Sequence, residues 1–143
     1  MNKHQILMDM RNEHTLKGLK PCFVILSSAN GKLYTGSTSD FIMSLKKGVL
    51  YFQRLSMFFH TLKPKDDVSY PISTFIEYKI VKKSSFSSLL YLYTKEGNYI
   101  QISYQTGLPD TQSTEYNLSK ILEELEEAGI KQAELEDSND EAA

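Results

Sequence analysis

The sequence predicts a mixed α+β domain, built mainly from antiparallel strands and closed by one amphipathic helix near its C-terminal end. Nine tyrosines and seven phenylalanines fall largely in short apolar segments that turn signals separate, and aromatic side chains fit a pleated, half-buried surface. Residues 113–128 instead repeat their apolar positions at helical spacing. We therefore expect a short helix, then about seven strands, then this second helix.

The size and composition of the chain fit one domain. It has 143 residues, of which 41% are hydrophobic, and its single cysteine excludes an intramolecular disulfide. Cys22 lies in an apolar run without basic neighbours, so we interpret it as a small buried hydrophobic residue and not as a reactive thiol. Neither a signal-peptide pattern nor an apolar run of about 20 residues is present, which predicts a cytoplasmic protein.

The N-terminal part is expected to hold one helix and one hairpin. Residues 3–12 carry apolar side chains at helical spacing and predict a short amphipathic helix. Residues 22–28 read as the first strand. The dipeptide Asn30-Gly31 is a strong hairpin signal, and it predicts a return strand at residues 32–35.

The middle of the chain reads as a series of strands. Residues 40–45 form a short apolar segment, residues 49–55 and 56–62 are expected strands, and a polar loop follows at 63–67. Residues 72–82 alternate between apolar and polar positions, as expected of a half-buried strand. The apolar positions of that strand are Ile72, Ile76, Tyr78 and Ile80.

A Ser-rich loop at residues 82–88 then leads to the clearest hairpin. Residues 95–98 form a turn between two aromatic-rich runs. Pairing Thr94 with Tyr99 places six large side chains on one face, which makes this register self-consistent. The six are Leu89, Tyr91, Tyr93, Ile100, Ile102 and Tyr104.

The C-terminal helix is expected at residues 113–128, with Gly129 as the residue that ends it. Its apolar stripe comprises Leu118, Ile121, Leu122 and Leu125. From about Lys131 the chain loses apolar content and predicts an acidic, disordered tail. The predicted organisation is thus a helical extension at 1–19, the domain at 20–130 and the tail at 131–143.

Two segments carry a resemblance to a known family. Residues 48–55, followed by 57–59, resemble the central strands of bacterial PH-like and GRAM-like domains. Residues 70–76 resemble the entry of those domains into their next strand, and the hairpin and helix follow in the expected order. The resemblance covers residues 20–130 and implies a partly open PH-like barrel with a C-terminal helix. A bacterial or phage source fits the style of the chain.

The resemblance implies a scaffold that binds lipid headgroups, peptides or proteins and that is rarely catalytic. Members that bind phosphoinositides resemble one another in a cluster of Lys and Arg around the first hairpin loop. Here residues 27–32 offer only Lys32, so the sequence departs from that pattern. A shared fold does not by itself assign a function.

Charge is unevenly distributed along the chain. Residues 110–143 hold eleven acidic residues and two lysines, a net charge of −9, so the total of −2 leaves +7 on residues 1–109. Two interpretations stay open: the acidic helix and tail are solvated and keep the protein soluble, or the tail competes with an anionic partner for a basic face. The lysines expected at such a face are Lys46, Lys47, Lys63, Lys65, Lys82 and Lys83, with Arg54 and Lys79 as further members.

Residues for catalysis or metal binding are not evident. His4, His14 and His60 lack the spacing of a metal site, and Asp66-Asp67 reads as a solvated turn and not as a catalytic carboxylate pair. Phosphate-binding and nucleophile motifs are missing too. The sequence therefore predicts no enzyme, no cofactor and no metal.

The function that we expect is a binding module for a protein partner, through an exposed sheet edge or the N-terminal helix. Two alternatives stay open: peripheral binding to anionic membrane lipid through the lysine-bearing loops, and a small enzyme whose site the sequence does not reveal. Nucleic acid is disfavoured because the basic excess is modest and the pI is about 5.9. The sequence leaves the identity of the partner and the formation of homo-oligomers open.

Overall fold

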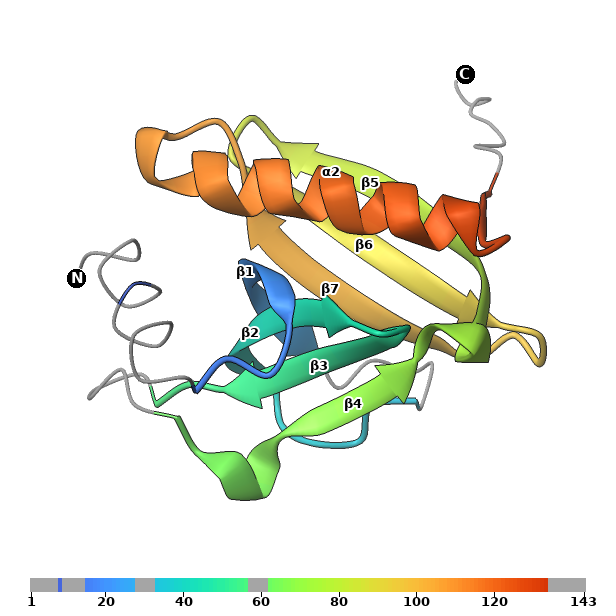
Figure 1. The fold of residues 1–143 in the computed structure, drawn as a ribbon. Coiled ribbons are helices and arrows are strands. Elements are labelled where there is room, and N and C mark those ends of the chain that lie inside the picture. The colour runs from blue at the N-terminus through green and yellow to red at the C-terminus, as the bar shows by residue number, and fades with distance from the viewer. Residues whose placement is uncertain (1–7, 9–14, 28–32, 57–61, 134–143) are drawn as a thin grey trace.

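The computed structural model describes residues 8, 15–27, 33–56 and 62–133. One mixed sheet of eight strands, in the order β4-β3-β2-β1-β7-β6-β5-β8, carries the fold, together with one C-terminal helix (Figure 1). The strands are β1 (Leu19–Ser27), β2 (Ser39–Lys46), β3 (Val49–Arg54), β4 (Val68–Pro71), β5 (Phe75–Ser84), β6 (Ser87–Thr94), β7 (Tyr99–Gln105) and β8 (Lys131–Gln132). The helix α2 spans Gln112–Glu127, and three 3₁₀ turns are η1 (Pro64–Asp66), η2 (Ile72–Thr74) and η3 (Pro109–Thr111).

Side-chain contacts, and not backbone pairing, join β4 to the start of β5 in the described part of the chain. Figure 1 shows β2, β3 and β4 in one half of the molecule and β7, β6 and β5 in the other, with α2 across the second half. The rings of Tyr70 in β4 and Phe75 in β5 have centroids 6.1 Å apart. They end a series of edge-to-face contacts that runs through the core. The series is Tyr34, Phe41, Phe52, Tyr70 and Phe75.

Helix α2 confirms the predicted C-terminal helix. Leu118, Ile121 and Leu125 are buried in the core shared with the sheet. The helix ends in a Schellman motif: Gly129 has a φ of 97°, and the N–H of Ile130 donates to the carbonyl of Leu125 at 3.0 Å. Ile130 is itself buried, so this turn directs the chain back onto the sheet, where Lys131 and Gln132 form β8 beside β5. The predicted tail therefore begins with a short strand, and residues 134–143 lie outside the described part.

A buried glutamine holds residues 15–17 against the outside of β3. The amide of Gln53 accepts from the N–H of Lys17 at 2.9 Å and donates to the carbonyl of Thr15 at 2.7 Å. A second, smaller apolar cluster forms under this segment. It comprises Ile42, Leu55, Leu16, Phe23 and Leu62.

The return strand predicted at residues 32–35 is wrong, because the strand that pairs with β1 is β2, which begins only at Ser39. Tyr34 is buried against Phe41, and its hydroxyl donates to the carbonyl of Ser37, so this stretch forms a loop folded into the core. The predicted turn at Asn30-Gly31 lies outside the described residues. The same holds for residues 57–61 of the predicted strand at 56–62, and for the predicted helix at 3–12 apart from Met8.

The register predicted for the hairpin at 89–104 is wrong by one residue. Tyr93 pairs with Tyr99 and Leu92 with Ile100, so the connection is one residue longer than predicted. The side chain of Thr94 stabilises this longer loop, because its hydroxyl accepts a hydrogen bond from the N–H of Asn98 at 3.1 Å. In the observed register the core takes Leu90, Leu92, Ile100, Ile102 and Tyr104. The other three tyrosines of this hairpin, Tyr91, Tyr93 and Tyr99, cluster on the outer face.

The alternation predicted for residues 72–82 is interrupted by an irregularity between Phe75 and Glu77. It places Phe75 in the core and leaves Ile76 46% exposed, although Ile76 was expected on the apolar face. The Ser-rich loop predicted at 82–88 is also wrong, since β5 continues to Ser84 and β6 begins at Ser87.

Candidate functional site

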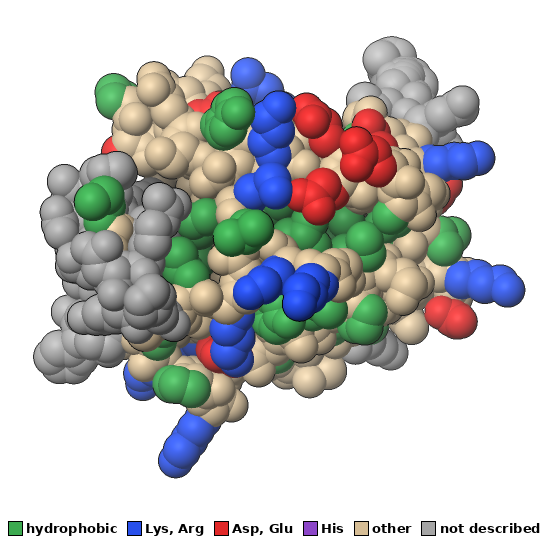
Figure 2. Space-filling view, in the orientation of Figure 1, with side chains coloured by type: hydrophobic (Ala, Val, Ile, Leu, Met, Phe, Trp, Pro, Cys, Tyr) green, Lys and Arg blue, Asp and Glu red, His purple; other side chains and the backbone are tan. Residues whose placement is uncertain are grey.

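The six predicted lysines lie in pairs at three different places. Lys46 ends β2 and Lys47 lies in the turn to β3. Lys63 precedes η1 and Lys65 lies within it, at the other end of β3, roughly 17 Å away for a strand of six residues. Lys82 and Lys83 lie near the end of β5. That strand has ten residues, so its ends are roughly 30 Å apart. Figure 2 shows Lys and Arg side chains dispersed over this face of the molecule.

The two further basic residues make local contacts. Arg54 forms an ion pair with Asp66 at 3.2 Å, and its backbone N–H donates to Asp67 at 2.9 Å. Asp67 also pairs with Lys17 at 3.2 Å. The two aspartates thus fasten η1 and the N-terminal segment to β3.

The outer edge of β5 is the feature that distinguishes this sheet. β8 pairs with it in parallel only at Glu77 and Tyr78, and the N–H of Ala133 donates to the carbonyl of Tyr78 at 2.7 Å. From residue 79 to residue 84, no strand of the described part pairs with that edge. Alternate residues of a strand direct their N–H and C=O groups to opposite sides, so the groups of Ile80 and Lys82 face the open edge, as those of Tyr78 do.

Three tyrosines lie on the outer face of the sheet, beside this edge. Tyr91 and Tyr93 of β6 and Tyr99 of β7 form one cluster, with ring centroids 5.6 to 6.1 Å apart. Lys79 of β5 lies opposite Tyr91, with its Nζ 5.3 Å from the centroid of that ring. Burial raises the pKa of Tyr91, against the opposing effect of the positive charge on Lys79. The phenol is therefore neutral at physiological pH and offers a hydroxyl and a ring face.

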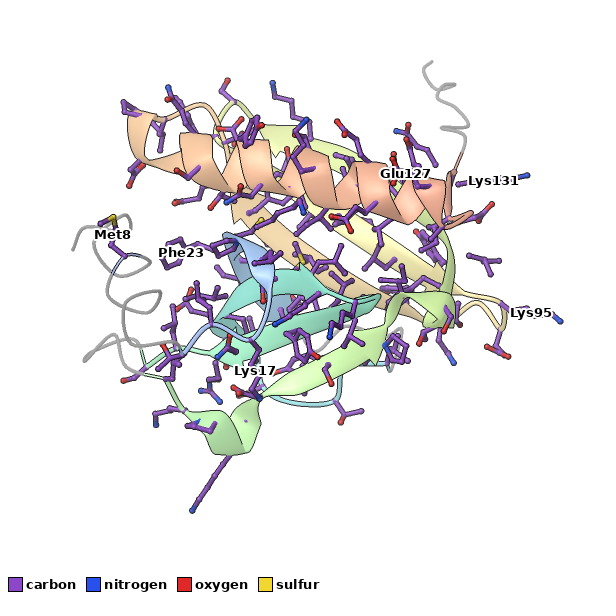
Figure 3. All side chains as sticks on the ribbon, viewed as in Figure 1. Met8, Lys17, Phe23, Lys95, Glu127 and Lys131 are labelled. Atoms are coloured by element: carbon purple, nitrogen blue, oxygen red, sulfur yellow. The ribbon has the colours of Figure 1, made fainter. Side chains whose placement is uncertain are left out.

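Helix α2 is fixed over the start of the same edge. The hydroxyl of Tyr78 donates to the carboxylate of Glu126 at 2.5 Å. Burial, and then the hydrogen bond to Glu126, raises the pKa of Tyr78 to about 12. Figure 3 places Glu127 and Lys131 at this end of the helix, with Lys131 extending away from the body of the molecule.

Stability should fall between pH 10 and pH 12 because of Tyr78. Its pKa is about 10 in an unfolded chain and about 12 in the fold, so the folded state retains a proton that the unfolded state has lost. The contribution is fully present below pH 10 and is lost as the pH rises through 12; a shift of two units corresponds to roughly 2–3 kcal/mol. Urea unfolding at pH 9, 10 and 11 measures the slope, which should be shallower in Tyr78→Phe. An unchanged slope in that variant would contradict the assignment.

The remaining candidates for chemistry have structural roles. Cys22 is fully buried, as predicted, and burial raises the pKa of its thiol. Within residues 15–27, 33–56 and 62–133, no group of three His, Cys, Asp or Glu side chains could hold a metal ion. The three histidines lie outside the described residues. Among the described helices, none has the length and apolar character needed to cross a membrane.

No protein-family model matches the chain. No curated protein matches it at a significant level. Among solved structures, the hSac2 domain from human phosphoinositide phosphatase Sac2 is similar over 95% of this chain and 94% of that chain, with 13% sequence identity and a TM-score of 0.49. At that identity and TM-score, the similarity assigns no function.

Lys79, Lys82 and Lys83, which were predicted to lie on a basic face, all belong to β5. The open edge of β5 could not be located from the sequence, because β8 is two residues long and the pairing of Glu77 with Lys131 spans 54 positions of the chain. The excess of acidic residues after residue 110 was the one related signal in the sequence.

Proposed function

We propose that the chain is a PH-like, non-catalytic module that binds an extended segment of a partner protein by adding it as a strand to the free edge of β5. The observation that supports the proposal is β8: this edge already accepts a strand at Glu77 and Tyr78, while the edge from residue 79 onward is open in the described part. The sheet of eight strands with one C-terminal helix is consistent with a PH-like fold.

Strand addition provides both affinity and selectivity. The N–H and C=O groups of Ile80 and Lys82 supply main-chain hydrogen bonds to the added strand. Alternate side chains of that strand would then lie beside Lys79 and Val81 on the tyrosine side of the sheet. The half-buried side chain of Val81 offers apolar contact there.

The charge of the edge favours an acidic segment. Residues 79–84 contain Lys79, Lys82 and Lys83 and no acidic residue. Lys82 and Lys83 are exposed and have no ion-pair partner in the described part of the chain. The expected partner segment is therefore extended, acidic at alternate or adjacent positions, and bound less tightly as salt rises.

The proposal is tested with an acetylated eight-residue peptide of alternating Glu and Val as the probe, followed through backbone amide shifts in the full chain. We expect the shifts of Ile80 and Lys82 to change most. The double variant Lys82→Glu with Lys83→Glu should weaken binding about tenfold or more, because two attractions become repulsions.

The matched control is Lys46→Glu with Lys47→Glu, which makes the same change of charge at the β2–β3 turn. It should leave the affinity within about twofold, given that charges far apart at the surface are screened. Equal losses in both variants would overturn the edge as the site. Vesicles of phosphatidylserine form a separate arm: if they bind the chain through Lys82 and Lys83 while the peptide does not, the lipid alternative replaces the proposal.

A further inference from the structure

The chain itself continues along the same edge of β5. Lys131 lies beside Glu77 and Gln132 beside Tyr78, so partners in this parallel ladder are 54 positions apart. If the same register continues, Glu136 lies beside Lys82 and Asp137 beside Lys83. Residues 134–143 hold five acidic residues and no basic one.

We propose that residues 134–143 extend β8 along the open edge of β5 and compete there with the partner segment. The competition rests on the proposed function, because it requires a partner segment. The docking of residues 134–143 does not, and it can be observed in the chain alone. The occupant is a segment of this chain whose position is fixed at its start, since Ile130 is buried and the N–H of Ala133 is bonded to Tyr78.

Charge complementarity supports this occupant along the open part of the edge. Two acidic residues of α2 near the start of the edge already have partners: Glu126 accepts from Tyr78, and Glu124 pairs with Lys20 at 2.6 Å. Glu77 lies in register with Lys131, so opposite charges already adjoin each other across β5 and β8. Further along the edge, in residues 79–84, the only charged side chains are lysines, and residues 134–143 supply acidic side chains of opposite charge.

The competitor is a weak one. Leu135 is the single large apolar residue in residues 134–138, so the segment gains little from burial. Exposed ion pairs are each worth about 0.2–1 kcal/mol and are screened by salt. The short tether compensates, because it presents the segment at an effective concentration in the millimolar range. A partner segment with better side-chain contacts can displace it.

The test compares three proteins: the full chain, a chain that ends at Ala133, and a full-length variant with Glu134→Gln, Glu136→Gln and Asp137→Asn. Hydrogen exchange of the Ile80 and Lys82 amides reports on the edge. The amides of Lys79 and Val81, which face β6, are internal controls. We expect exchange at Ile80 and Lys82 to be about threefold or more faster in both altered proteins, and in the full chain at 0.5 M salt compared with 0.05 M.

The same proteins are titrated with the Glu–Val peptide, and the shortened chain should bind it about threefold or more tightly than the full chain. Equal exchange rates at Ile80 and Lys82 in all three proteins overturn the docking of residues 134–143, whatever the peptide does. If exchange changes as expected but no protein binds the peptide, docking stands and the proposed function fails. If docking is seen and the peptide binds all three proteins equally, the segment docks without competing, and the competition is refuted.

Discussion

Replacing Phe52 with alanine is expected to lower the free energy of unfolding by about 3–5 kcal/mol. The side chain is fully buried, with rings of Phe41 and Tyr70 at centroid distances of 6.4 and 6.0 Å. Tyr70 in turn contacts Phe75, the first residue of β5. The substitution therefore leaves a cavity and also weakens the side-chain contact between β4 and β5, which do not pair with each other in the described part.

Urea unfolding of the purified variant measures this loss. Phe86→Ala is the matched control, because it removes the same ring from a position that is 53% exposed, and it should change stability by no more than about 0.5 kcal/mol. A loss below about 1 kcal/mol in Phe52→Ala would mean that the ring series contributes little to holding the two halves together.

The elements that the sequence predicted well are those specified locally. The apolar stripe of α2 and Gly129 at its end depend on neighbours within a few turns, so periodicity and a residue that tolerates positive φ suffice to place them. The strand at 49–55 is likewise bounded by the Lys47-Gly48 turn, in which both residues have positive φ.

The hairpin register could not be decided by the pattern alone, because both faces of residues 89–94 are rich in large side chains. Leu90 and Leu92 form one parity, and Leu89, Tyr91 and Tyr93 form the other. Packing against β1 and α2 decides which set becomes the core, and the aliphatic set is the one that fills it. Tyr91 and Tyr93 stay half-buried on the outer face, so their hydroxyls are not enclosed in the core, where an unpaired polar group is costly.

The candidate site depends on a contact that has no local signature. A strand of two residues has no measurable alternation, and its partner lies 54 positions earlier in the chain. The sequence could indicate that basic and acidic residues are separated, whereas only the fold brings the start of the acidic segment to the basic strand. The other predicted lysines lie at the end of β2, in the β2–β3 turn and at η1, and they do not adjoin this edge.

Replacing Leu125 with alanine is expected to lower the free energy of unfolding by about 2–5 kcal/mol. Its side chain is fully buried in the core, and its carbonyl accepts from the N–H of Ile130 in the turn that leads to β8. The variant should therefore lose stability in urea and, under native conditions, exchange the amide of Tyr78 faster, because the strand that covers it is less firmly held.

The control for Leu125→Ala is Tyr116→Ala, on the same helix at a position that is 63% exposed, and it should leave both measurements nearly unchanged. If Leu125→Ala accelerates exchange at Tyr78 only by the factor expected from its loss of global stability, then β8 is as stable as the core, and the edge of β5 beyond it is rigid. If the exchange at Tyr78 accelerates by more than the change in global stability, β8 opens on its own, and the helix sets how often the edge of β5 is available to a partner.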